Sequence, residues 1–168
     1  MRNRVIFFLI LVSLLCVALL LQIPLPGYTR IDLTDDGTER SILSAVIPDN
    51  ETVILTWRNS QFGLQVKEAF VARSGLLIQT QVTFSAQDGS PPPRVSPQDV
   101  DDLYHTGGPF DARGLSRPFN RIIYRIGEIG DPKIHVQNKI ISLKEEVGFG
   151  GRVILTTKRP FLYEVIFR

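Results

Sequence analysis

From residue 51 to its end the chain carries short runs in which apolar and polar residues alternate, separated by turn-forming residues. Such period-two runs are typical of half-buried β-strands. The first three, TVILTWR, LQVKEAFVAR and LLIQTQVTFS, follow one another closely and predict an antiparallel meander. In the third run the alternation assigns one face to four apolar residues: Leu76, Ile78, Val82 and Phe84.

The last third of the chain returns to this pattern. FNRIIYRIG alternates so that Ile122 and Tyr124 share one face and the arginines that flank them share the other. KIHVQNKIIS predicts a hairpin that turns at Asn138 and Lys139, because asparagine tolerates the left-handed conformation. RVILTTK and FLYEVIFR are the last two expected strands, and the glycine-rich GFGG before them is interpreted as a hairpin turn.

The segment DGSPPPRVSP interrupts the strands, because three consecutive prolines cannot join a sheet ladder. Ser96 is expected to cap a short helix over PQDVDDLYH, which Gly107 and Gly108 end. GPFDARGLSRP is expected to be a loop. About eight short strands and one short helix predict an all-β fold, either a small β-sandwich or a partly closed barrel.

Residues 5–23 form an uncharged apolar run, VIFFLILVSLLCVALLLQI, preceded by Arg2 and Arg4. At about 1.5 Å per residue a helix of this length spans about 28 Å, close to the thickness of the hydrocarbon core of a bilayer. The sequence QIPLPG matches a signal-peptidase site poorly, so an uncleaved transmembrane anchor is favoured over a cleaved signal peptide. The arginines place residues 1–4 in the cytoplasm. The chain is then a single-pass protein of the cytoplasmic membrane whose C-terminal domain is periplasmic or extracellular.

The cysteine content and the charge limit the chemistry and the partners that the outer domain can have. Cys16 lies inside the apolar run, and Leu15 before it does not suit a lipoprotein processing site. The sequence has no other cysteine, which excludes disulfides and thiol chemistry from the outer domain. Without Arg2 and Arg4, basic and acidic residues balance at 17 each, which argues against nucleic acid as a partner.

Residues 24–50 are expected to be a linker and an acidic loop, with the extracytoplasmic β-domain at residues 51–168. The prolines of PLPGY end the apolar helix. Within DLTDDGTER, Asp35, Asp36 and Gly37 predict a tight turn. Its carboxylates do not have the spacing of a calcium-binding loop, so no metal site is expected there.

A recognisable catalytic set is absent from the sequence. His105, at the end of the expected helix, and His135, on an expected strand, are far apart, and one cysteine does not complete a zinc site with them. No G-x-S-x-G motif is present. Glu145 and Glu146 are adjacent, so on a strand they would point to opposite faces. We therefore expect neither an enzyme nor a protein that depends on a metal or a cofactor.

Four arginines lie in a stretch that contains no acid: Arg113, Arg117, Arg121 and Arg125. A glycine and a proline interrupt any helix there, so only the last two are expected to share a face, on a strand. A solvated basic face is one interpretation. The other is a site for a carboxylate ligand or an acidic partner, which the planar guanidinium suits.

Two stretches carry a resemblance to a known family: WRNS followed by EAF in residues 57–70, and IIYRIGEIGDPKIHVQNKIISL near the end. Over about residues 50–160 they resemble the bacterial and archaeal family named domain of unknown function 1850. In that family a histidine stands where this chain has Asn59. Asparagine cannot titrate but forms hydrogen bonds, so we interpret the turn as a structural corner whose backbone groups Asn59 and Ser60 satisfy, with Trp57 in the core.

Members of that family are often encoded beside TRAP-type transporters of the TAXI class, which import small organic anions. The resemblance therefore implies a non-enzymatic, membrane-anchored extracytoplasmic β-domain that is an accessory or interaction partner of such a transporter. Its partners would be the lipid bilayer, through residues 5–23, and a transporter subunit. The alternative is a small anionic-ligand binding module of the cell envelope. The expected contact residues are Asn59, Ser60, Glu68, Arg121, Arg125 and His135.

Overall fold

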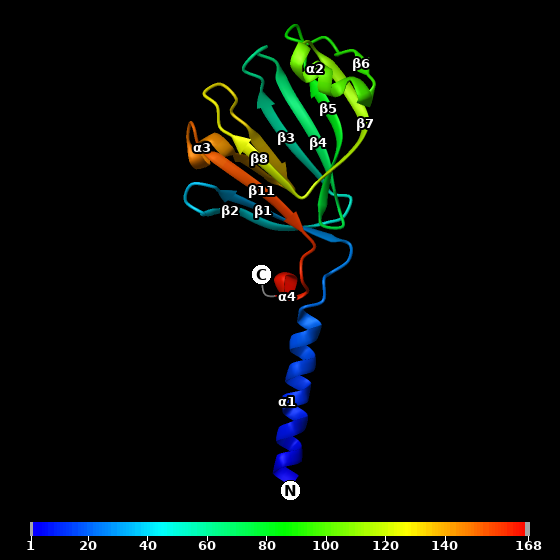
Figure 1. The fold of residues 1–168 in the computed structure, drawn as a ribbon, viewed down its shortest axis with the longest axis vertical. Coiled ribbons are helices and arrows are strands. Elements are labelled where there is room, and N and C mark those ends of the chain that lie inside the picture. The colour runs from blue at the N-terminus through cyan, green and yellow to red at the C-terminus, as the bar shows by residue number, and fades with distance from the viewer. Residues whose placement is uncertain (1, 167–168) are drawn as a thin grey trace.

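A computed structural model describes residues 2–166 and shows a β-sheet domain carried at the end of one long helix (Figure 1). The long helix, α1, covers Arg2–Leu21. The strands are β1 (Tyr28–Asp35), β2 (Ser41–Pro48), β3 (Thr52–Arg58), β4 (Gln65–Arg73), β5 (Leu76–Phe84), β6 (Arg94–Val95), β7 (Phe110–Phe119), β8 (Arg121–Arg125), β9 (Lys133–Val136), β10 (Lys139–Ser142) and β11 (Arg152–Lys158). The short helices are η1 (Pro97–Asp99), α2 (Val100–Thr106), α3 (Leu143–Val147) and α4 (Tyr163–Ile166). The expectation of an all-β domain is thus confirmed.

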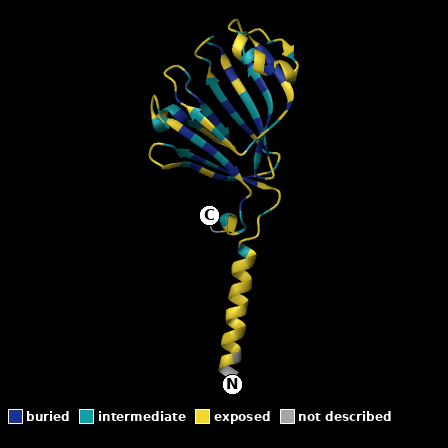
Figure 2. Cartoon of the chain, viewed as in Figure 1, coloured by how far each residue is buried: buried dark blue, intermediate teal, exposed yellow. Residues whose placement is uncertain are grey.

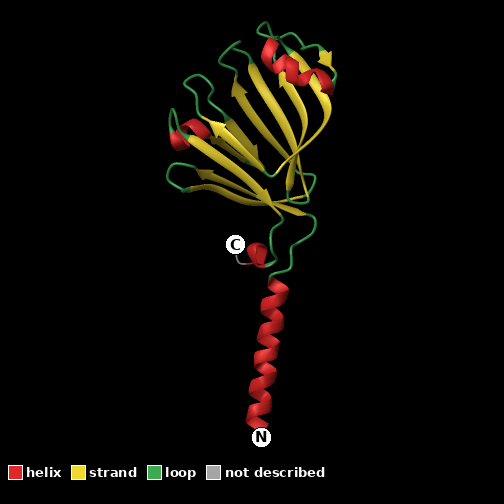
Figure 3. Ribbon diagram, viewed as in Figure 1, coloured by secondary structure: helices red, strands yellow, loops and turns green. Residues whose placement is uncertain are grey.

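The strands form two sheets. One has four strands in the order β2-β1-β11-β8, and the other has seven in the order β10-β9-β3-β4-β5-β7-β6. Neighbouring strands are antiparallel except for the short β6, which runs parallel to β7. The expected meander is present as β3-β4-β5. In Figure 3 the strands of both sheets converge near the base of the domain and fan out away from it.

The seven-stranded sheet presents one inner face, and two different layers cover it. The four-stranded sheet packs on one part of this face around residues such as Ile31, Leu55 and Phe70. The helix α2 packs on the other part around Val66 and Phe84. In Figure 2 the buried residues lie mainly on the strands of both sheets, whereas α1 is coloured as exposed along nearly all of its described length. Burying each large aliphatic side chain stabilises the fold by about 1.5–3 kcal/mol, so both contacts contribute to stability.

The two sheets are joined at the converging end by the turn between β4 and β5. The Gly75 N–H donates to Thr29 Oγ1 at 3.0 Å, and Thr157 Oγ1 donates to the Gly75 carbonyl at 2.9 Å. Gly75 has a φ of +82°, and a Cβ there would lie 2.5 Å from the backbone nitrogen of Arg159. Only glycine allows this close approach without strain. The sheets are therefore fixed at this end and diverge at the other.

The N-terminal helix ends at Leu21, just before the prolines of PLPGY. The expected anchor, residues 5–23, therefore lies in α1 and the two residues that follow it. Among the residues described, no helix combines the length with the apolar character that crossing a membrane requires.

The assignment of residues 24–50 to a linker and acidic loop is wrong. This segment holds β1 and β2, which make half of the four-stranded sheet. Arg30 and Asp32 form an ion pair beside each other on the half-buried side of β1, while Ile31 and Leu33 are fully buried between the sheets. The charges that suggested a loop therefore belong to the polar side of a core strand. The tight turn after it is confirmed, because Asp35 Oδ1 accepts from the Gly37 N–H at 2.9 Å.

The segment GPFDARGLSRP, expected to be a loop, forms most of β7 and pairs with β5. Phe110 and Ala112 are buried in this strand. The pairing register shifts between Arg113 and Arg117, and Gly114 within that interval has a φ of +79°. The glycine therefore marks an irregularity inside a strand and does not end it.

The expected helix start at Ser96 is confirmed, with η1 leading directly into α2. The end of α2 is also as expected, since the Gly107 N–H donates to the Leu103 carbonyl at 3.0 Å. The hairpin of β9 and β10 is confirmed, but its turn is one residue earlier than expected. Gln137, with a φ of +53°, occupies the left-handed position in place of Asn138.

Two other C-terminal expectations are wrong. Glu145 and Glu146 lie in the helix α3, because Ser142 Oγ accepts from the Glu145 N–H at 3.3 Å and caps a helical turn. GFGG consequently joins α3 to β11 and does not connect two strands of a hairpin. FLYEVIFR holds the helix α4 where a strand was expected: Phe161 forms an isolated bridge with Pro24, and its N–H donates to Glu164 Oε2 at 2.8 Å at the start of the helix; residues 167–168 lie outside the described part.

Candidate functional site

The inner face of β4 carries a glutamate between the two layers that cover the seven-stranded sheet. Inward positions on β4 alternate from Val66, which packs under α2, through Glu68 to Phe70, which packs under the four-stranded sheet. Trp57 of β3 packs against both apolar groups. Glu68 therefore lies at the boundary between the part of the sheet under α2 and the part under the four-stranded sheet.

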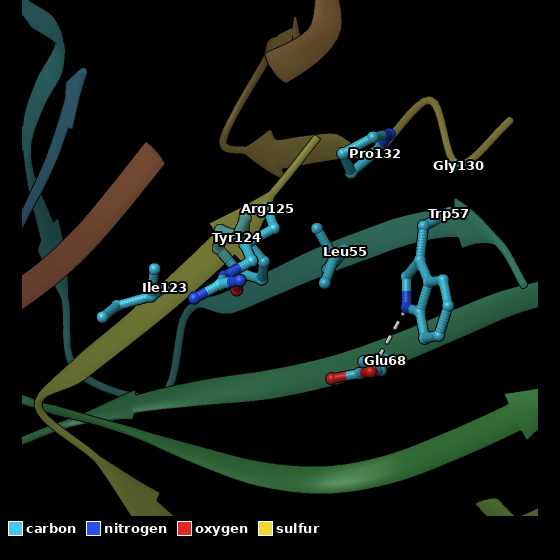
Figure 4. Close-up of a pocket in the computed structure, with 8 residues that line it drawn as sticks. All are labelled: Leu55, Trp57, Glu68, Ile123, Tyr124, Arg125, Gly130 and Pro132. Carbon is cyan, nitrogen blue, oxygen red and sulfur yellow. Dashed lines mark hydrogen bonds between the residues drawn. The ribbon is translucent and has the colours of Figure 1, made fainter. Parts of the chain in front are cut away.

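Three neutral donors from three elements bind the Glu68 carboxyl group. Trp57 Nε1 of β3 donates to Oε1 at 3.3 Å, and the Tyr104 hydroxyl of α2 donates to the same oxygen at 3.2 Å. Gln79 Nε2 of β5 donates to Oε2 at 3.0 Å. Figure 4 shows the indole of Trp57 directed at this carboxyl group. The carboxyl group thus ties α2 to the sheet.

The position of Gln79 depends on a bulge that the sequence pattern does not reveal. The register of β4 and β5 shifts so that Ala69 pairs with Gln81 and Phe70 with Gln79, leaving Thr80 as the extra residue. Leu77 and Gln79 therefore face inward before the bulge, and Val82 and Phe84 face inward after it. The expectation that Leu76 and Ile78 share a face with Val82 and Phe84 is wrong for this reason.

Burial raises the pKa of Glu68, and the hydrogen bonds from Trp57, Tyr104 and Gln79 only partly offset this effect. Its carboxyl group therefore stays neutral to a higher pH than an ordinary glutamate. The nearby Glu68 charge and burial together raise the pKa of Tyr104, so that hydroxyl remains a donor at any physiological pH.

Tyr124 of β8 brings a second polar group to the same region. Its hydroxyl is buried and has no hydrogen-bond partner among residues 2–166. Burial raises its pKa, and the charge of Glu68 raises it further, which places the two groups within electrostatic reach of each other. A buried hydroxyl without a partner costs about 1–3 kcal/mol of stability. A bound water, ion or ligand that accepts a hydrogen bond from this hydroxyl would satisfy it.

A hollow of about 220 Å³ opens between β8 and the inner face of the seven-stranded sheet (Figure 4). Its lining combines these polar groups with apolar side chains: Leu55, Trp57, Glu68, Ile123, Tyr124, Arg125, Gly130 and Pro132. It lies below the range of about 300–1,000 Å³ that drug-sized ligands occupy, so it suits a small molecule.

Arg125 supplies the positive charge of the lining. It forms no ion pair with any other residue of the described part of the chain. Two other arginines of the same region are paired: Arg113 with Asp111 and Arg117 with Asp101, each at 2.8 Å. The cation at the hollow is therefore available to a ligand, whereas those on β7 are not.

The structure brings together two of the six residues that the sequence suggested as contacts. Glu68 and Arg125 both line the hollow. Arg121 lies exposed at the other end of β8, and His135 of β9 lies 3.4 Å from Thr56 Oγ1, next to Ile54 of β3 and outside the lining. The six residues therefore do not form a single site. Tyr124 lies in the lining with Glu68 and Arg125, while Tyr104 and Gln79 bind the Glu68 carboxyl group from outside the lining.

At the corner RNSQ the role expected of Asn59 is confirmed, whereas the Ser60 side chain forms no hydrogen bond with the turn in the described part of the chain. Asn59 Oδ1 accepts from the backbone N–H groups of Gln61 and Phe62, both at 2.9 Å. The Asn59 backbone also pairs with Leu64 and Gly63 across the turn. Ser60 is exposed. Asn59 therefore closes the turn between β3 and β4 and does not reach the hollow.

Each oxygen of Glu68 already accepts a hydrogen bond, and neither His105 nor His135 lies among its partners or in the lining. Comparison with known proteins identifies no matching family model, no matching curated protein and no matching solved structure.

Proposed function

We propose that this chain is a non-enzymatic binding module of the cell envelope, and that the hollow between β8 and the seven-stranded sheet takes a small organic anion. The observation that carries the proposal is the buried, unpaired hydroxyl of Tyr124 in a lining that also holds an unpaired Arg125. A donor and a cation without partners both call for an acceptor with negative charge.

The other residues of the lining support the same ligand class. Leu55, Ile123 and Pro132 provide an apolar wall on which a short hydrocarbon body can pack. Glu68 would repel an anion if it were ionised, but its raised pKa favours the neutral acid. A neutral carboxyl group carries a proton that it can donate to the ligand. The best candidates are therefore compact monocarboxylates.

The proposal is tested by titrating full-length protein in detergent with benzoate and isovalerate, using the corresponding amides as uncharged controls. Calorimetry should detect binding of the acids and not of the amides. Tyr124→Phe should weaken binding roughly tenfold, and Arg125→Gln should weaken it roughly tenfold to a hundredfold. Arg121→Gln is the matched control, because it removes an exposed arginine from the same strand outside the lining.

Tyr124→Phe has a second expected effect that separates a binding role from a packing role. Without ligand, the variant should be more stable than the wild type by up to about 1 kcal/mol, since it removes a buried hydroxyl that has no partner. A variant that is less stable and binds the acids unchanged would refute the proposal, because the hydroxyl would then serve the fold alone.

The proposed placement of the module is extracytoplasmic, anchored by residues 5–23, with a TRAP-type transporter subunit of the TAXI class as its partner. Anchoring is supported by the uncharged run and by the exposure of large apolar side chains along α1. The transporter rests on the resemblance to the domain of unknown function 1850 family. Crosslinking of tagged full-length protein in native membranes, followed by mass spectrometry, tests it. Recovery of an integral transporter subunit is the expected result, and recovery of none would remove this partner.

A further inference from the structure

The end of α1 and the C-terminal segment are held together by backbone hydrogen bonds. The Leu25 N–H donates to the Pro160 carbonyl at 2.8 Å, and the Leu162 N–H donates to the Ile23 carbonyl at 3.1 Å. Pro24 and Phe161 form an isolated antiparallel bridge between the two. The segment 160–166 consequently lies at the point where α1 joins the domain, as Figure 1 shows.

The polar side of this C-terminal segment is attached to the domain through Glu164. This carboxylate accepts from Arg30, from Lys158 at 2.8 Å and from the Phe161 N–H at 2.8 Å. Its side chain is only 6% exposed. Because Glu164 faces inward, Tyr163 and Ile166 on the same short helix remain exposed.

A groove separates this segment from the end of α1. Its lining is largely apolar: Ala18, Leu21, Gln22, Phe161 and Tyr163. The rings of Phe161 and Tyr163 are stacked, with centroids 5.8 Å apart and an interplanar angle of 10°. The groove is continuous with the exposed apolar side chains of α1, which occupy all sides of that helix.

We infer that this groove and the exposed residues of α4 bind the lipid bilayer surface, so that the C-terminal segment is a second membrane contact beside α1. Tyrosine is enriched at the boundary between lipid and water, which suits the exposed ring of Tyr163. Arg159, which is exposed beside the segment and forms no ion pair within residues 2–166, can meet lipid phosphates. A lipid surface accounts for the groove, the rings and the apolar surface of α1 with one occupant. The inference rests on the proposed anchoring of residues 5–23.

The test uses single spin labels on full-length protein in vesicles of dioleoylphosphatidylcholine, with collision rates measured for oxygen and for a water-soluble nickel chelate. The label on the native Cys16, which is exposed on α1, reports on the anchor itself. In a Cys16→Ser background, Ile166→Cys reports on α4 and Ile140→Cys is the matched control. These isoleucines are similarly exposed, at 57% and 65%, but Ile140 lies on the distant hairpin of β9 and β10.

The expected result is that position 166 shows more oxygen and less nickel accessibility than position 140, at values between those of positions 140 and 16, because α4 lies at the bilayer surface. If position 16 is in lipid and position 166 is as open to nickel as position 140, the second contact is refuted and the anchor stands. If position 16 is also open to nickel, the anchor fails as well. Dipolar broadening at position 166 would show that a second copy of the chain occupies this surface, which also refutes the inference.

Discussion

Replacing Glu68 by glutamine should remove the pH dependence of stability that this buried carboxyl group imposes. Glutamine keeps the shape of the side chain and still offers an oxygen to Trp57 Nε1 and the Tyr104 hydroxyl. Its new amide donor faces Gln79, which can rotate its own amide by half a turn and accept. The network can therefore survive the change, and only the ionisation is lost.

The size of the effect on the free energy of unfolding follows from the raised pKa of Glu68. The unfolded side chain titrates near its ordinary value of 4.5, while burial holds the folded pKa higher. Between these two values the folded state binds the extra proton, so the free energy of unfolding falls as the pH rises through this window. Above the folded pKa the loss is constant, at about 1.4 kcal/mol for each unit by which the pKa is raised. Below 4.5 the loss vanishes.

Glu68→Gln should thus be more stable than the wild type at pH 8 and should lose that advantage below pH 4.5. Urea unfolding of full-length protein in detergent, followed by circular dichroism at several pH values, measures the difference. Glu68→Leu is the contrasting variant, because it leaves three donors without an acceptor at about 1–3 kcal/mol for each fully buried one. Parallel curves for wild type and Glu68→Gln across the whole range would refute the raised pKa.

Two further substitutions test the turns that position the site. Asn59→Ala should lower the free energy of unfolding by about 1 kcal/mol, since the N–H groups of Gln61 and Phe62 lose the oxygen that they share; an unchanged midpoint in urea would contradict this role. Gly75→Ala should cost clearly more than Gly89→Ala: both have positive φ values, +82° and +75°, but only at Gly75 would the Cβ meet backbone atoms. Equal losses in the same urea assay would show that the close approach to Arg159 is unimportant.

The strands of the meander are predictable from the sequence because apolar and polar residues alternate along most of each run, although the bulge at Thr80 changes which residues of β5 face the core. Trp57, expected in the core, packs there beside Val53 and Leu55 of the same strand. β1 and β7 were not predicted as strands. In β1 charged residues alternate with the buried ones, and in β7 a glycine breaks the apolar pattern. Tertiary pairing with β11 and β5 decides their conformation, and a local pattern cannot report that pairing.

The hollow was only partly predictable. Glu68 and Arg125 attract attention as charged residues among apolar strands. Gln79, by contrast, reaches Glu68 only because the bulge at Thr80 reverses the phase of β5, and a single unpaired residue leaves no periodic signal. Tyr104 lies on α2, which packs on the sheet through ring contacts such as the one between Tyr104 and Phe84. These contacts join residues far apart in the sequence, so a local pattern does not predict them.

Glu68 lies at the boundary between α2 and the four-stranded sheet. This position explains why the same residue holds α2 to the sheet and lines the proposed site. A boundary between two apolar layers leaves a strip of sheet that neither layer covers, and a polar side chain there can be paired from both directions. Trp57 and Gln79 pair it from within the sheet, and Tyr104 pairs it from α2. The remaining open side faces β8, where Tyr124 has a donor without a partner. The fold thus accounts for three hydrogen bonds to the carboxyl group and leaves the hydroxyl of Tyr124 without a partner among residues 2–166.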